Sequence, residues 1–330
     1  MIVESPTPAG AIMARHCSHF ASRWIKLLLA LGLLGLETSA RAADPNFNRP
    51  TFENVSYGPH ERNVLDLWQA TSDRPTPLLV FIHGGGFVQG DKSGIHRNPA
   101  VRKALDAGVS FATINYRFRE HAPLQDILRD AARAIQYIRS RAAEWNIDPA
   151  RIASYGSSAG AGTSMWLAFH DDLADPAAAD PVLRQSSRLI AAGSLDGQAS
   201  YDLRDWDAIV GASPYQREAA ELLKFYDFQS ADEMDTPAAD RIMKDCSMLN
   251  LISKDDPPVV IACAIPNEEP ASRGDYVHHP KHSIALAERC KANGVECRLI
   301  LHDETAGDRP RQASLAVAFL LEKLKNPAAK

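Results

Sequence analysis

Two short glycine-containing segments carry residues that could support acyl chemistry at a serine. The first, Gly156-Ser157-Ser158-Ala159-Gly160, has the pattern G-x-S-x-G and lies between an apolar run and a helical pattern. A strand that turns sharply into a helix at such a pattern leaves the central serine hydroxyl exposed. The helix N-terminus adds unpaired N–H groups and a partial positive charge beside that hydroxyl. Ser158 is therefore predicted to be a nucleophile.

The second segment, His83-Gly84-Gly85-Gly86-Phe87, directly follows the apolar run 77–82. Acyl transfer to a serine creates an oxyanion that needs hydrogen-bond donors. Three consecutive glycines let the backbone come close to a substrate, and we expect the N–H groups of Gly84, Gly85 and Ala159 to form the oxyanion hole. His83 is expected to have a structural role in this motif.

The elements around these segments alternate between strand and helix. Five apolar runs are typical of strands buried on both faces of a parallel sheet. They cover residues 77–82, 109–116, a segment that ends at Tyr155, 189–193 and 259–264. A half-buried hairpin over 54–69 precedes them, and 296–302 predicts a last strand. Helical patterns lie between them, the longest over 124–145. The expected fold class is α/β, with a mostly parallel central sheet and helices on both faces.

These motifs together resemble the α/β-hydrolase superfamily, in its HGGG-type esterase/lipase group. That group includes hormone-sensitive-lipase-like and feruloyl- and acetyl-xylan-esterase-like enzymes. The resemblance spans about residues 52–325, and its motifs are HGGGF at 83–87, Asn115-Tyr116-Arg117, Asp148-Pro149 with Arg151-Ile152, GSSAG at 156–160 and Lys254 to Pro258. It implies an α/β-hydrolase fold with Ser158 as nucleophile, followed in the chain by an acid and then a histidine.

The family order places the acid after the strand that ends at Ala264. Glu268, Glu269 and Asp275 all follow that strand in a long loop. Asp275 is preferred, because the D-x-V stretch before the helix over 282–292 resembles the place where relatives carry their acid.

The histidine departs from the family pattern. Relatives carry it in a glycine-rich turn about five residues beyond His302, and this chain has no histidine after His302. His302, at the predicted end of the last strand, is the expected base. His278, His279 and His282 are the alternatives, together with the absence of any base.

The N-terminal segment and a strand-free segment later in the chain indicate the domain organisation. Arg23 and Lys26 precede the apolar run 27–36, and small residues surround Ala42. This pattern predicts a signal peptide over 1–42, with cleavage near Ala42 and export to the periplasm or the extracellular space. Residues 43–330 are expected to form one domain, in which the strand-free segment of about 205–249 is a helical lid.

Composition limits the classes of partner. The chain has 330 residues, 45% of them hydrophobic, and a formal net charge of −5, which does not predict a nucleic-acid partner or a stable membrane anchor. We expect no metal and no cofactor, because no C-x-x-C or histidine-rich spacing is present. Cysteines 246, 263, 290 and 297 would be compatible with one or two disulfides after export or with buried thiols, and their pairing stays open.

The sequence thus predicts a secreted serine carboxylesterase that cleaves small acyl or carbohydrate esters through an acyl-enzyme. Two alternatives remain. The displaced histidine is compatible with a catalytically impaired hydrolase-fold protein that binds a ligand, and the same fold also supports exopeptidases. The oligomeric state is not predicted.

Overall fold

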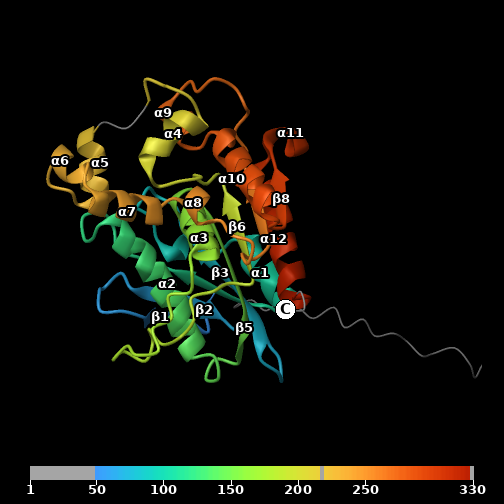
Figure 1. The fold of residues 1–330 in the computed structure, drawn as a ribbon. Helices are drawn as coiled ribbons and strands as arrows, with labels where there is room; N and C mark the ends of the chain where they lie inside the picture. Colours follow the sequence, from blue (N-terminus) through green and yellow to red (C-terminus); the bar gives the residue numbers. More distant parts are fainter. Residues whose placement is uncertain (1–48, 216–218, 328–330) are drawn as a thin grey trace, which may run out of the picture. The chain divides into compact units, whose positions relative to one another are not determined.

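A computed structural model of the chain describes residues 49–215 and 219–327, so the predicted signal peptide lies outside the described residues. An eight-stranded sheet runs through the described part in the order β1-β2-β4-β3-β5-β6-β7-β8 (Figure 1). The strands are β1 (Phe52–Ser56), β2 (Val64–Trp68), β3 (Thr76–Ile82), β4 (Ser110–Ile114), β5 (Ile147–Ser157), β6 (Ala191–Leu195), β7 (Val259–Ala262) and β8 (Cys297–Ile300). β2 pairs antiparallel with both β1 and β4, and all the other pairs are parallel.

Helices cover both faces of the sheet. Alternate residues of β3 show the division, because Leu78 and Val80 join one hydrophobic cluster and Leu79 joins the other. The first cluster contains side chains of α2 (Leu124–Ser140), α3 (Ala159–Phe169) and α10 (Pro280–Asn293), and the second contains side chains of α1 (Pro99–Asp106) and α12 (Arg309–Lys325). The expected α/β class, with a mostly parallel sheet and helices on both faces, is confirmed.

Strand register places the two glycine-containing motifs side by side. Ile82 of β3 pairs with Gly156 of β5, so the oxyanion segment and the nucleophile segment leave adjacent strands at the same level. Ser157 pairs with Leu195 of β6, and Leu195 pairs with Ala262 of β7. The loops after four strands therefore meet at one edge of the sheet, where open α/β sheets bind their ligands.

Between β6 and β7 the described residues 203–215 and 219–251 carry several short helices, and they overlap the predicted lid of about 205–249. Its elements are η2 (Leu203–Asp205), α4 (Trp206–Ile209), α5 (Ala219–Tyr226), α6 (Ala231–Met234), α7 (Pro237–Asp245) and α8 (Met248–Leu251). The Nε2 of His170, at the end of α3, lies 3.1 Å from Asp245 Oδ1 at the end of α7. This contact fastens the helical segment to the core.

Two local predictions differ from the structure. The last strand does not extend to His302, because β8 ends at Ile300 and His302 begins a short helix, α11 (His302–Thr305). The loop predicted after Ala264 contains another short helix, α9 (Arg273–Val277), whose N-terminus is capped by Ser272. None of the helices in residues 49–215 and 219–327 combines the length and the hydropathy that a membrane-spanning helix requires.

Candidate active site

Ser158 stands at a sharp turn between β5 and α3. Its backbone has φ 52° and ψ −119°, a conformation that costs about 1–3 kcal/mol for a residue with a side chain. The flanking glycines make the turn sterically feasible. A Cβ on Gly160 would lie 2.1 Å from the carbonyl oxygen of Ile82, and one on Gly156 would lie 2.3 Å from the carbonyl carbon of Gly160. Both positions therefore require glycine.

A histidine lies within hydrogen-bond distance of the serine hydroxyl. His278 Nε2 is 2.8 Å from Ser158 Oγ, and His278 Nδ1 is 3.0 Å from the carbonyl oxygen of Gly274. A carbonyl oxygen only accepts, so Nδ1 carries the proton of the neutral ring and Nε2 is the acceptor. Ser158 therefore donates to His278, which is the arrangement a general base requires.

Two side-chain donors hold the main chain at His278. Gln198 Nε2 donates to the carbonyl oxygen of Val277 at 3.2 Å, and Cys263 Sγ donates to that of His278 at 3.4 Å. Gln198 follows β6 and Cys263 follows β7, so the imidazole is fixed relative to the sheet edge.

The other candidate histidines make contacts elsewhere. His302 Nδ1 is 3.2 Å from Asp303 Oδ1, and His279 Nε2 donates to the carbonyl oxygen of Glu268 at 2.8 Å. His282 is fully buried beneath Trp206, with ring centroids 4.8 Å apart, and burial lowers its pKa to about 3. The structure thus brings His278 to the nucleophile instead of the expected His302, because the chain turns into α11 as soon as β8 ends.

No predicted carboxylate takes the position of a triad acid. Asp275 Oδ2 accepts the hydroxyl of Ser272 at 2.8 Å, as part of the cap of α9. Glu268 and Glu269 are exposed. The ring of His278 instead reaches back four residues to the Gly274 carbonyl, which is the natural partner of a side chain at the end of a one-turn helix. The D-x-V stretch that favoured Asp275 as the acid directly precedes His278, but it does not by itself single out this histidine as the base.

The glycine segment after β3 lies against the nucleophile. A Cβ on Gly84 would be 3.2 Å from Ser158 Cβ and 2.6 Å from the carbonyl oxygen of Ser157. Gly85 has φ 116° and Gly86 has φ 61°. The carbonyl oxygen of Gly85 accepts hydrogen bonds from the backbone N–H groups of Val88 and Gln89. Gly86 and Ala159 line the same small cavity as Ser158. The segment therefore presents backbone rather than side chains to the serine.

His83 anchors this segment from behind. Its ring stacks on Tyr116 with centroids 4.4 Å apart, its Nδ1 lies 2.7 Å from the carbonyl oxygen of Gly84, and Tyr116 Oη donates to the His83 carbonyl oxygen at 2.6 Å. Burial lowers the pKa of His83, so its ring is neutral. These contacts agree with the structural role expected for His83.

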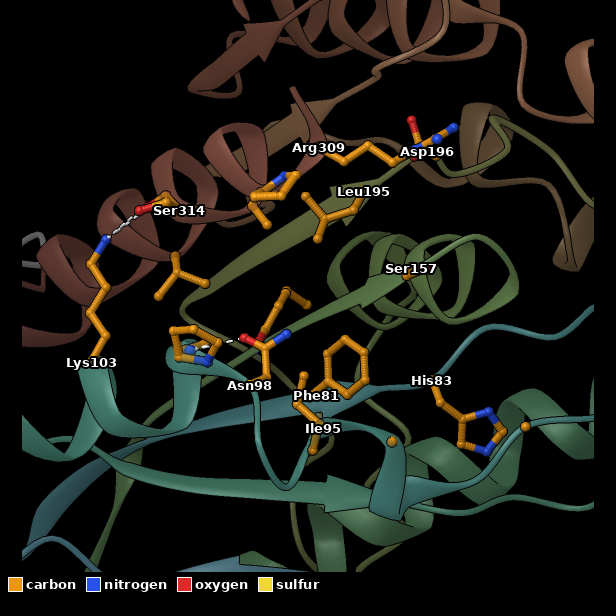
Figure 2. A pocket seen from close by; sticks show the side chains of 18 of the residues that line it. Phe81, His83, Ile95, Asn98, Lys103, Ser157, Leu195, Asp196, Arg309 and Ser314 are labelled. Atoms are coloured by element: carbon orange, nitrogen blue, oxygen red, sulfur yellow. Dashed lines mark hydrogen bonds and ion pairs between the residues drawn. The ribbon is translucent and has the colours of Figure 1, made fainter. Parts of the chain in front are cut away.

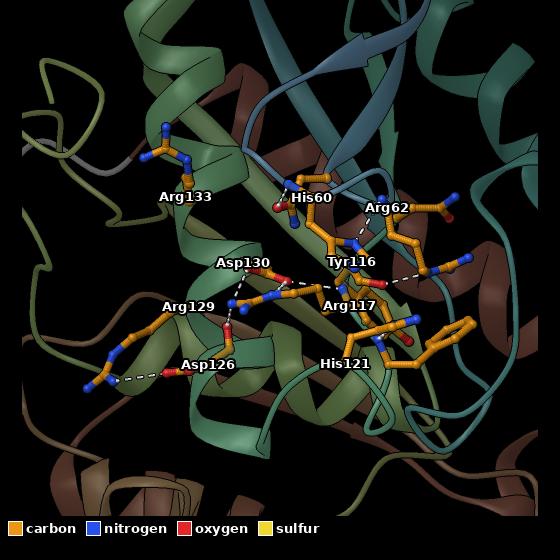
Figure 3. A network of polar contacts seen from close by, with 12 residues as sticks. His60, Arg62, Tyr116, Arg117, His121, Asp126, Arg129, Asp130 and Arg133 are labelled. Carbon is orange, nitrogen blue, oxygen red and sulfur yellow. Dashed lines mark hydrogen bonds and ion pairs between the residues drawn. The ribbon is translucent and has the colours of Figure 1, made fainter.

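A polar network joins this region to the hairpin and to α2 (Figure 3). Arg62 Nε donates to the carbonyl oxygen of Tyr116 at 2.9 Å, and its Nη2 donates to that of Gly90 at 3.1 Å. Arg117 makes a two-pronged ion pair with the buried Asp130, with both N–O distances 2.8 Å. The Asn115-Tyr116-Arg117 motif therefore supports the oxyanion segment from outside the site.

The cavity at Ser158 is small and aromatic. It has a volume of about 30 Å³, far below the roughly 300–1,000 Å³ that is usual for a small-molecule site. Trp206 and Phe225 from the helical segment line it together with Phe87 and Tyr201. Trp206 Nε1 donates to the Ser200 carbonyl oxygen at 2.8 Å, and Tyr201 Oη donates to that of Ala159 at 2.6 Å. Its walls are thus fixed by hydrogen bonds as well as by packing.

The remaining candidate ligands and nucleophiles are acidic residues, histidines and cysteines. In the described part of the chain, no group of three or more His, Cys, Asp or Glu residues is arranged to hold a metal ion. The four cysteines at 246, 263, 290 and 297 are free thiols. Burial raises the pKa of the Cys263 thiol to about 12, so it is a protonated donor near the site.

Solved structures share this architecture. A truncated carbohydrate esterase from gut microbiota matches with a TM-score of 0.64 at 20% identity, over 83% of this chain and 96% of that one. Esterase Est2 of Thermogutta terrifontis matches with a TM-score of 0.59 at 21% identity, over 84% of this chain and 94% of that one. At these identities the likeness establishes the fold.

Curated relatives are also esterases by name. A probable isoprenylcysteine alpha-carbonyl methylesterase, ICMEL1 of Arabidopsis thaliana, is 28% identical over 53% of this chain and 37% of its own length. Esterase LipC of Mycobacterium tuberculosis is 25% identical over 66% of this chain and 53% of its own length. The chain spans about a third of the length of the plant relatives that it matches.

The BD-FAE family profile matches residues 65–265, which is more than half of the chain. The matched segment includes the oxyanion segment and the nucleophile turn, and it ends before His278. The chain belongs to the BD-FAE family of α/β-hydrolase carboxylic ester hydrolases.

Proposed function

We propose that this protein is an exported serine carboxylesterase that cleaves small acyl esters, including acylated carbohydrates, through an acyl-enzyme on Ser158. The contact between Ser158 Oγ and His278 Nε2 carries the proposal, because it supplies the base that the sequence lacks at its usual place. Family membership supports the reaction class, and the family is one of carbohydrate and feruloyl esterases.

Each step of the proposed reaction is assigned to a named group of the site. His278 takes the proton of Ser158 as Oγ attacks the ester carbonyl, and the same ring then protonates the departing alkoxide. The developing oxyanion is stabilised by the proposed amides of Gly84, Gly85 and Ala159, to which we add Gly86 because it lines the cavity. The Gly274 carbonyl keeps the ring in the required tautomer. Water activated by His278 then releases the acid.

The small aromatic cavity beside Ser158 favours a short acyl group. Structures of Est2 with bound propionate and with bound butyrate share this fold, with TM-scores of 0.60 and 0.58. Export rests on the sequence pattern before Ala42, and sequencing the N-terminus of the purified native protein tests it.

Hydrolysis of p-nitrophenyl acetate and labelling by a fluorophosphonate test the central proposal. Ser158→Ala should abolish the labelling and reduce kcat by about 10⁴-fold or more. Ser157→Ala, one residue away, should keep the labelling. Absence of turnover and of labelling in the unchanged protein would refute the esterase proposal and favour the ligand-binding alternative.

A further inference from the structure

A second and much larger cavity lies on the other face of the sheet, between α1 and α12 (Figure 2). Its volume is about 840 Å³, within the range of small-molecule sites. It is lined from the strand ends by Phe81 and Leu195, and Ser157 of the nucleophile turn also reaches it. It shares no lining residue with the small cavity at Ser158. The esterase reaction therefore does not account for it.

Most of the wall is apolar. Ile95, Tyr155 and Val317 are buried side chains of three different elements that face this space. The exposed residues Lys103 and Ser314 stand at its edge, where Lys103 Nζ of α1 donates to the Ser314 carbonyl oxygen of α12 at 2.9 Å. The cavity thus opens at the surface and is braced across its mouth.

Two acidic groups of the wall already have partners. Arg309 Nε lies 3.0 Å from Asp196 Oδ2, and Asp91 accepts Ser93 N at 2.8 Å and Asn115 Nδ2 at 2.7 Å. Lys103 keeps its charge at the exposed edge, where it donates to Ser314. Inside the cavity an ionised ligand group would lose its hydration against the apolar wall, whereas an uncharged ligand avoids that cost.

Two neutral polar groups in the wall are unsatisfied, the Tyr155 hydroxyl and His83 Nε2. Tyr155 is 2% exposed, and its hydroxyl has no hydrogen-bond partner. Burial raises the pKa of Tyr155 far above its usual value, so the hydroxyl stays protonated and is available as a donor. Leaving such a group unpaired costs about 1–3 kcal/mol, which an oxygen atom on a ligand would recover.

We propose that this cavity, lined by α1, α12 and the ends of β3, β5 and β6, is a second ligand site for an uncharged, mostly apolar molecule that bears a hydroxyl or carbonyl oxygen. The apolar wall holds the body of the ligand. The Tyr155 hydroxyl is buried in this structure and its ring packs against Phe81, so donation to the ligand oxygen requires that ring to shift toward the cavity. The site is separate from Ser158 and does not depend on the proposed esterase activity.

Binding of 2-naphthol to the full chain, measured by calorimetry at pH 7, tests the proposal. At this pH 2-naphthol is uncharged, whereas 2-naphthoate has nearly the same size and carries a full negative charge. We expect 2-naphthol to bind at least tenfold more tightly than 2-naphthoate. Equal or tighter binding of the naphthoate would overturn the proposal.

Two variants locate the binding. Ala313→Trp, which fills the cavity from α12, should abolish it, whereas Ala318→Trp on the exposed face of the same helix should not. Tyr155→Phe keeps the ring and removes the hydroxyl, and it should weaken binding about fivefold, the equivalent of one hydrogen bond. Unchanged affinity in Ala313→Trp contradicts the proposal. If that variant fails to fold, unchanged affinity in Tyr155→Phe does so.

Discussion

Ser158 Oγ and His278 Nε2 lie 2.8 Å apart, although 120 residues separate them in the chain. The histidine comes from the segment after β7, where relatives of the predicted type carry their acid, and the Gly274 carbonyl takes the place of a carboxylate at Nδ1. The site is therefore a serine–histidine pair oriented by main chain.

This pairing predicts very different effects for two histidines. His278→Ala removes the base and should lower kcat for p-nitrophenyl acetate by about 10³-fold or more, with little change in KM. His302→Ala removes a side chain whose hydrogen bond is to Asp303, and it should change kcat less than threefold. Steady-state kinetics decide the question, and a larger loss in His302→Ala than in His278→Ala would contradict the assignment.

Gln198 is predicted to be a positioning residue for His278. Gln198→Glu keeps the size of the side chain but replaces the amide donor to Val277 O with a repelling oxygen. We expect kcat to fall about tenfold with KM nearly unchanged, because a displaced base weakens the transition state more than substrate binding. Gln229→Glu, on the exposed surface of the helical segment, is the matched control. A rise in KM alone would show that Gln198 acts on substrate binding.

Phe225 is expected to limit the length of the acyl group. Phe225→Ala enlarges the cavity at Ser158 and should raise the ratio of kcat/KM for p-nitrophenyl butyrate over acetate by at least fivefold. Phe228→Ala deletes a neighbouring buried phenylalanine that does not line the cavity, so the ratio should stay the same. An equal change of the ratio in both variants would indicate a general loosening of the helical segment.

Asp256 is predicted to make stability depend on pH. Burial raises its pKa to about 6, above the ordinary value of about 3.9 that we expect in the unfolded chain. The folded state therefore holds the proton more tightly. The resulting stabilisation is fully present below about pH 4 and is lost as the pH rises through 6.

Asp256→Asn removes this dependence. At each pH, the free energy of unfolding of the unchanged protein is subtracted from that of the variant. This difference should be larger at pH 8 than at pH 4, by up to about 3 kcal/mol. Urea unfolding at the two pH values measures the difference, and Asp73→Asn, at an exposed position away from Asp256, is the control. A difference of the opposite sign would mean that the Arg188 side chain, 3.7 Å away, outweighs the burial of Asp256.

The sequence by itself determined the features that are encoded locally. The glycines around Ser158 and the segment 83–87 predict the turn and its backbone-lined neighbour, because only glycine tolerates contacts as close as that between Gly160 and Ile82 O. The uninterrupted apolar runs predict a sheet that is covered on both faces, and the hydrophobic clusters confirm it.

Only the tertiary structure decided which histidine meets the serine. The four candidates have the same chemistry, and their distance from Ser158 depends on strand register and on where short helices begin. Pairing of β6 with β7 brings the loop of Gln198 beside that of Cys263, and the single turn of α9 then directs His278 inward. α11 directs His302 toward Asp303. Such long-range geometry arises from packing between distant segments, so no local pattern contains it.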